Sequence, residues 1–139
     1  MPIDGFQHVN IRTTDADRAR DFYVRALGLR VGDRPPFASF GYWLYLGDVP
    51  VVHLVQLAPD DTREPGSGRL DHLAFHGVDI EATRQTLTAA GIAFREAIVP
   101  RDGTVQIFIH DPDGLKIELN FEEEHGPAKA GHYRNTRSA

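Results

Sequence analysis

His8-Val9-Asn10-Ile11-Arg12-Thr13 is the stretch that decides the fold, because it returns 64 residues later as His72-Leu73-Ala74-Phe75-His76-Gly77. An aspartate stands two residues beyond each stretch, and a helical pattern follows both. A second pair of positions supports the repeat, since His53 in residues 51–55 corresponds to Glu118 in residues 116–120. Packing alone does not require four metal-capable side chains at two matching strand positions. The repeat therefore predicts an internal duplication, with a metal site where the two units meet.

The composition excludes several classes of protein. The chain has 139 residues, of which 41% are hydrophobic and 25% charged, as in an ordinary globular protein of one domain. It has no cysteine, so disulfides, thiolate ligands and a cysteine nucleophile are excluded. A net charge of −5 without a basic stretch disfavours nucleic acid as a partner. Without a long apolar run or a signal-like N-terminus, we expect no membrane span and a cytoplasmic location.

The first unit begins with a strand and a helix. Residues 6–12 alternate in polarity, as a half-buried strand does, and the apolar face holds Val9 and Ile11. Apolar residues then recur at helical spacing between residues 19 and 27. Thr14 is the expected N-cap of this helix, and Gly28 its end. Three strands are expected after it, over residues 29–33, 40–46 and 50–57.

The second unit repeats this order after a linker. Residues 58–69 are rich in proline, glycine and charge, as linkers are. The expected elements of the second unit are strand 70–78, helix 80–90 between Asp79 and Gly91, and strands 93–99, 105–110 and 115–121. Residues 122–139 form a tail. The chain is thus predicted to be one α+β domain, residues 1–139, of two βαβββ modules (about 4–57 and 70–121) whose curved mixed sheet encloses a cup-shaped site.

Strand parity selects the side chains that could carry chemistry. In the last strand, Ile117 and Leu119 would pack under a helix, so Glu118 faces the opposite side. An ionised glutamate on a largely apolar strand is costly unless it is paired or metal-bound. The expected ligands are His8, His53, His72 and Glu118. Imidazole and carboxylate suit Fe, Mn, Ni, Co or Zn as divalent ions, and four ligands leave two positions of an octahedral ion for a substrate that chelates through two oxygens.

These motifs resemble the vicinal oxygen chelate superfamily, which includes glyoxalase I, extradiol dioxygenases, and fosfomycin- and bleomycin-resistance proteins. The resemblance rests on the duplication, on the first-helix pattern of residues 21–29 and on Asp111-Pro112-Asp113-Gly114 followed by Ile117-Glu118-Leu119. It covers residues 4 to 122. It implies a metal-dependent enzyme acting on a small substrate, usually a homodimer with its site between modules. Glyoxalase-like isomerase or lyase chemistry ranks above oxygen-dependent ring cleavage.

The resemblance also implies individual roles. His8, His72 and Glu118 match family ligands, and Glu118 would additionally move a proton as the catalytic residue. His53 stands where glyoxalase I enzymes usually have a glutamate. Arg12 matches an arginine that contacts glutathione, whereas Leu57 replaces an asparagine that does so.

Several alternatives stay open from the residues alone. His53 could line a pocket or act as a base, and Arg12 is either a clamp for a substrate carboxylate or a surface salt-bridge partner. Asn10 and Asn120 are candidate substrate contacts. The aromatic residues between 37 and 45 could wall a pocket or simply pack. The rival functions are an extradiol-type dioxygenase and a metal-independent binding protein of the bleomycin-resistance kind.

Overall fold

The computed structural model describes residues 5–61, 70, 72–100 and 103–122. The predicted strand–helix–strand–strand–strand order occurs twice, as the sequence led us to expect. Its elements are β1 Val9–Thr13, α1 Ala16–Leu27, β2 Arg30–Gly32, β3 Gly41–Leu46, β4 Val49–Gln56, β5 His72–His76, α2 Ile80–Ala89, β6 Arg95–Ile98, β7 Val105–His110 and β8 Lys116–Phe121. Most of the expected linker, residues 62–69, and of the expected tail, residues 123–139, lies outside the described residues. None of the described helices is long and apolar enough to cross a membrane.

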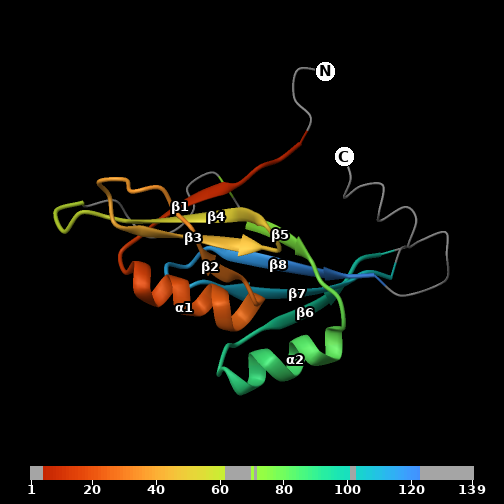
Figure 1. Cartoon of the computed structure of the whole chain (residues 1–139). Helices are drawn as coiled ribbons and strands as arrows, with labels where there is room; N and C mark the ends of the chain where they lie inside the picture. Colours follow the sequence, from red (N-terminus) through yellow and green to blue (C-terminus); the bar gives the residue numbers. More distant parts are fainter. Residues whose placement is uncertain (1–4, 62–69, 71, 101–102, 123–139) are drawn as a thin grey trace.

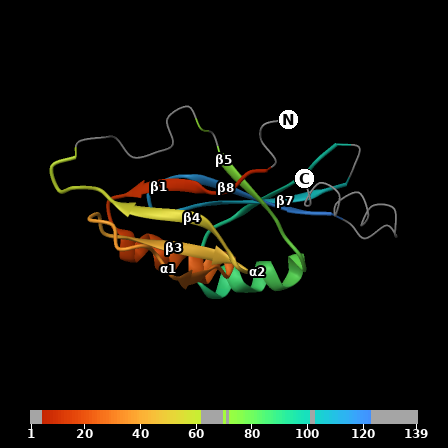
Figure 2. The ribbon, with the colours of Figure 1, turned by 45° about the horizontal axis from the view of Figure 1, so that its top comes forward.

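The strands form two four-stranded mixed sheets, one for each module. Their orders are β1-β4-β3-β2 and β5-β8-β7-β6. In each sheet the first strand of the module runs parallel to the last, and the other pairs are antiparallel. Both helices lie on the same side of the sheets (Figures 1 and 2). The predicted α+β class with two tandem βαβββ modules is confirmed, although the hydrogen-bonded strands make two sheets of four and not one continuous sheet.

The two modules share one hydrophobic core. Most of the α1 residues predicted to face inward are buried, among them Phe22 and Tyr23, and Leu27 is half-buried. Leu87 of α2 and Ile107 and Ile117 of the second sheet belong to the same cluster. Units of about 60 residues bury too little surface to be stable apart with ease, and sharing a core removes that difficulty.

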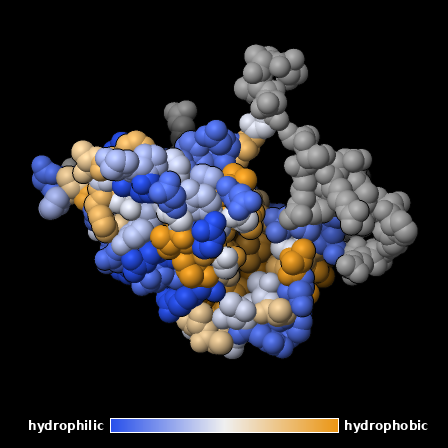
Figure 3. All heavy atoms as spheres, in the orientation of Figure 1, coloured by the Kyte–Doolittle hydropathy of each residue, from blue (hydrophilic) through white to orange (hydrophobic). Residues whose placement is uncertain are grey.

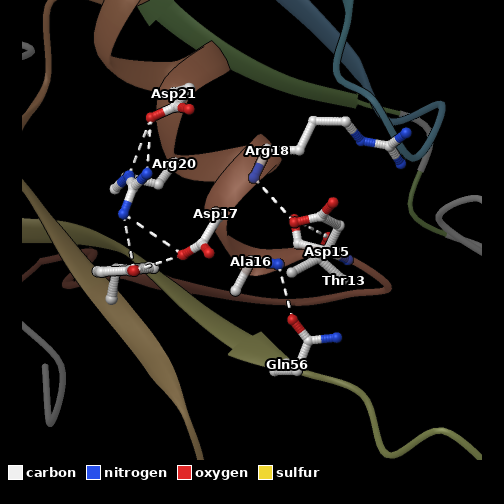
Figure 4. Close-up of polar contacts among 9 residues, drawn as sticks. Thr13, Asp15, Ala16, Asp17, Arg18, Arg20, Asp21 and Gln56 are labelled. Carbon is white, nitrogen blue, oxygen red and sulfur yellow. Dashed lines mark hydrogen bonds and ion pairs between the residues drawn. The ribbon is translucent and has the colours of Figure 1, made fainter.

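The start of α1 differs from the sequence prediction. Asp15 is the N-cap, and its carboxylate accepts a hydrogen bond from the backbone N–H of Arg18 at 3.0 Å (Figure 4). The prediction that Thr14 caps the helix is wrong, because its hydroxyl is used elsewhere. That hydroxyl donates to Asp113 of the second module at 3.0 Å. A long-range partner has displaced a local one. The predicted ends hold, since Gly28 and Gly91 adopt left-handed conformations just after the two helices.

The Asp111–Gly114 turn ties the second module to the first. Asp111 is buried and accepts hydrogen bonds from the Tyr23 hydroxyl and from the backbone N–H groups of Asp113 and Leu115, each at 2.9 Å. Asp113 accepts from the Thr13 hydroxyl at 2.5 Å. Burial raises the pKa of Asp111, and the three donors oppose that rise. The turn therefore serves the junction of the modules as well as the connection of two strands.

Candidate metal centre

The first sheet presents His53 on the face away from the core. In the strand register, His53 lies between Asn10 of β1 and Trp43 of β3. Leu54 and Leu44, one residue along, are fully buried toward the helices. Neighbours across a sheet point to the same side, so His53, Asn10 and Trp43 share the face away from the core.

His53 is enclosed between two aromatic rings. Its ring lies 3.9 Å from the ring centre of His8 and 4.0 Å from that of Trp43, and both pairs are inclined by only 11°. This stack leaves His53 8% exposed although it points away from the core. The two predicted ligands of the first module are thus in direct contact. Trp43 was expected only as one of several pocket or packing residues, and no spacing in the sequence revealed that it stacks on His53.

The surroundings of His53 decide its protonation. Its Nε2 lies 3.1 Å from the carbonyl oxygen of Pro50, which can only accept, so Nε2 carries the hydrogen. Burial lowers the pKa of His53, and repulsion from the nearby His8 lowers it further. A neutral ring with a lone pair on Nδ1 is the form that binds a metal ion.

The second sheet brings His72 and Glu118 together. The Nε2 atom of His72 lies 2.9 Å from Oε2 of Glu118, and Glu118 is 8% exposed. Two neighbouring ligand atoms on one ion, each bound at about 2.1 Å, lie about 3 Å apart. The pair therefore already has the spacing that a shared ion requires.

Gln106 of β7 is a functional candidate that sequence reasoning missed. Its side-chain N–H group donates to Oε1 of Glu118 and, at 3.3 Å, to Oδ1 of Asn120. In the register, Gln106 pairs with Asn120, and Phe108 pairs with Glu118. Parity along residues 105–110 would have placed Gln106 on the same face as Glu118, and that signal was available from the sequence.

The other expected residues lie on β1, β5 and β8. Asn10 lies beside His53, and Asn120 lies two residues along β8 from Glu118. Arg12 is exposed and forms no ion pair within the described part of the chain, which leaves its role as a substrate clamp a prediction. His76 is the last residue of β5.

The described residues of one chain form two half-sites. His8 meets His53 in the first module, and His72 meets Glu118 in the second. Within residues 5–61, 70, 72–100 and 103–122, no group of three or more such side chains is close enough to hold an ion. Three imidazoles and one carboxylate nevertheless suit a divalent ion of the Fe-to-Zn series. His72 and Glu118 already have ligand spacing, whereas the stacked rings of His8 and His53 direct their lone pairs along nearly parallel planes and would have to turn to share an ion.

Comparison with known proteins shows the family of the chain. A family model described as Glyoxalase/Bleomycin resistance protein/Dioxygenase superfamily matches residues 5–119. The chain belongs to this superfamily. A solved glyoxylase/bleomycin resistance protein/dioxygenase domain from Frankia sp. EAN1pec superposes with a TM-score of 0.72 at 19% identity, covering 87% of this chain and 99% of that one. Likeness at that identity shows the superfamily fold alone.

Two relatives in the superfamily carry names that describe an activity. A lactoylglutathione lyase of Escherichia coli O157:H7 is 34% identical over 129 residues, which cover 86% of this chain and 93% of the relative. A protein named Glyoxylase I 4, from Arabidopsis thaliana, is 29% identical over 126 residues, covering 86% of this chain and 71% of the relative.

Proposed function

We propose that this protein is a metal-dependent enzyme of the glyoxalase type, with isomerase or lyase chemistry on a small substrate. His8, His53, His72 and Glu118 would hold the ion. The observation that carries the proposal is the spacing of 2.9 Å between Nε2 of His72 and Oε2 of Glu118 on the outward face. In the duplicated module, His8 and His53 are in contact through their stacked rings. The lactoylglutathione lyase relative supports the class of reaction.

The roles of the residues follow from their surroundings. When bound, a divalent ion supplies Lewis-acid chemistry and stabilises negative charge on the two substrate oxygens it chelates. Glu118 would take a proton from the carbon next to a substrate carbonyl and return it to the neighbouring carbon, because it is the one carboxylate of the set. Neutral His53 leaves the total charge of the ligands low, which favours an anionic reaction intermediate. Asn10, Asn120 and Arg12 are the proposed substrate contacts.

A second copy of the chain would complete the site. The two half-sites lie in different modules, so the first module of one chain would face the second module of its partner in a symmetric dimer. Apolar surface is available for such contact. Phe37 is 54% exposed, and its ring centre lies 6.2 Å from that of Trp43 on the outward face. Figure 3 shows further hydrophobic residues toward the middle of the molecule in that view.

Complementation between two inactive variants tests the shared site. One variant carries His8→Ala and His53→Ala, and the other carries His72→Ala and Glu118→Ala. After unfolding and refolding of an equal mixture, half of the dimers are mixed, and each mixed dimer has one intact site of two. We expect about a quarter of the wild-type metal content and activity to return. Recovery of nothing would mean that the four ligands must come from one chain.

Metal content decides between this function and a metal-independent binding protein. Purified protein is analysed for bound metal, stripped with EDTA, reloaded and assayed for lactoylglutathione formation. We expect one ion per protomer and activity that follows metal content. A protein that takes up no ion, and whose ligand binding survives His8→Ala with Glu118→Ala, would be a binding protein. Oxygen uptake with a catechol, absent with lactoylglutathione precursors, would identify the dioxygenase alternative.

A further inference from the structure

The two oxygens of Glu118 have different partners. Oε2 faces His72 at 2.9 Å, whereas Oε1 accepts a hydrogen bond from the side-chain amide of Gln106. Gln106 comes from β7, the strand next to β8, and is partly buried. The carboxylate is therefore held from both sides, with one oxygen directed toward the half-site and the other tied to the sheet.

Gln106 is itself fixed in place. Its Nε2 also lies 3.3 Å from Oδ1 of Asn120, its neighbour in the strand register. An amide group with two acceptors on alternate positions of β8 cannot turn away without breaking hydrogen bonds on a partly buried face. The hydrogen bond to Glu118 is therefore a durable feature of this face of the sheet.

We propose that Gln106 is a positioning residue that keeps Glu118 a one-oxygen metal ligand, an inference that rests on the metal-dependent function proposed above. A carboxylate can bind an ion through one oxygen or through both. Binding through both would turn Oε1 toward the ion and weaken its hydrogen bond with the Gln106 amide, which would keep only the longer contact with Asn120. Gln106 thus selects the first mode by making the second costly.

Whether Glu118 binds through one oxygen or through both sets the number of coordination positions left for a substrate. Four ligand atoms on an octahedral ion leave two positions, and a substrate that chelates through two neighbouring oxygens needs both. If Glu118 supplied both of its oxygens, one position would remain, and chelation would be blocked. Gln106 therefore determines whether the centre accepts substrates with two adjacent oxygens, without touching the substrate itself.

The test uses cobalt-loaded full-length protein and two probes. Acetohydroxamate chelates through two oxygens, and azide binds through a single nitrogen. In Gln106→Leu we expect the affinity for acetohydroxamate to fall about tenfold or more, because loss of a hydrogen bond to a charged group is of that size. Azide affinity should stay within about twofold, and the visible spectrum of Co²⁺ should change because its ligand atoms change. Far-UV circular dichroism checks folding.

Three comparisons make the test decisive. Gln106→Glu keeps the length of the side chain but cannot donate when ionised, so its affinity for acetohydroxamate should also fall. This variant replaces Gln106→Leu in the test if the leucine variant does not fold. Gln85→Leu, the same change on the exposed face of α2, should behave as wild type. If both Gln106 variants bound acetohydroxamate and azide with wild-type affinities, the positioning role would be overturned and the proposed function would stand. Failure of the wild-type protein to bind cobalt would overturn the proposed function, and this inference with it.

Discussion

Tyr23→Phe removes a single hydroxyl from the junction between the modules. Tyr23 is completely buried, and its hydroxyl donates at 2.9 Å to Oδ2 of the buried Asp111. Phenylalanine fills the same space and keeps the edge-to-face contact with Phe22, whose ring centre lies 5.3 Å away. The change therefore isolates one hydrogen bond that joins α1 to the turn of the second module.

The size of the effect follows from the charge and burial of the acceptor. A buried hydrogen bond to a charged group contributes about 1.5–3 kcal/mol, and here its loss leaves one carboxylate oxygen with no donor in its place. For a chain of this size, that lowers the melting temperature by about 5–12 °C. Tyr45→Phe is the matched control, because it removes a hydroxyl that donates at 2.6 Å to the carbonyl oxygen of Asp33 at an exposed site. We expect that control to cost about 0.5 kcal/mol or less.

The stability deficit of Tyr23→Phe should depend on pH, and the pKa of Asp111 determines the direction of that dependence. Burial raises the pKa of Asp111, and the hydrogen bond from Tyr23 lowers it, so Tyr23→Phe raises that pKa further. A carboxyl whose folded pKa is raised adds stability while protonated, and that contribution is lost as the pH rises through the folded pKa. The deficit of Tyr23→Phe should be complete at pH 7 and shrink as the pH falls through the pKa of Asp111.

Urea unfolding of both proteins between pH 4 and 8 measures this deficit. Combining Tyr23→Phe with Asp111→Asn should give less than the sum of the separate effects, because the two residues share one hydrogen bond. A deficit below about 0.5 kcal/mol at pH 7, or one that does not change with pH, would refute the account of the junction.

Two further predictions concern the first sheet. The chain has one tryptophan, and since Trp43 stacks on His53, binding of Co²⁺ or Ni²⁺ should quench its fluorescence in wild type and leave it unchanged when His53→Ala removes that ligand. A Cβ on Gly41 would lie 2.0 Å from the carbonyl oxygen of Leu54, so Gly41→Ala should lower the free energy of unfolding by about 2 kcal/mol or more in urea titrations. In the control Gly47→Ala, the new Cβ meets no atom within 4 Å, and the positive φ should cost only about 1 kcal/mol.

The sequence allowed the elements and their faces to be predicted because their causes are local. Alternating polarity and helical spacing report burial directly, so the buried face of α1 and the outward direction of Glu118 were both expected. Contacts that join distant residues were not expected. Thr14 was assigned as a cap because nothing nearby indicates that Asp113, 99 residues away, takes its hydroxyl.

The candidate site could be predicted as a set of residue types and not as an arrangement. The duplication identified His8, His53, His72 and Glu118, since matching positions are visible in the chain. It contained no information on which of them meet, because that depends on the relative placement of two sheets. Gln106 is an intermediate case. Alternation along its strand indicates the face on which it lies, but nothing in the sequence indicates that it donates to Glu118 of β8.

The two modules have diverged around their corresponding ligands, and His53→Glu tests the physical reason. That change introduces the residue that glyoxalase I enzymes usually have, but the surroundings suit a neutral ring. A carboxylate there would meet the negative face of the Trp43 ring and the carbonyl oxygen of Pro50, and the positive charge of Arg34, which lowers the pKa of His53, would offset these only in part.

We therefore expect metal-free His53→Glu to be less stable than His53→Gln by about 1–3 kcal/mol at pH 7, because the new charge is poorly solvated and two of its neighbours repel it. The difference should shrink as the pH falls toward the pKa of the new carboxyl and when a divalent ion is added, since protonation or metal binding neutralises the charge. Urea unfolding of both variants with and without Co²⁺ measures it. Equal stability of the two variants without metal would show that the aromatic stack does not select a neutral ligand, and the divergence of the modules would then need another cause.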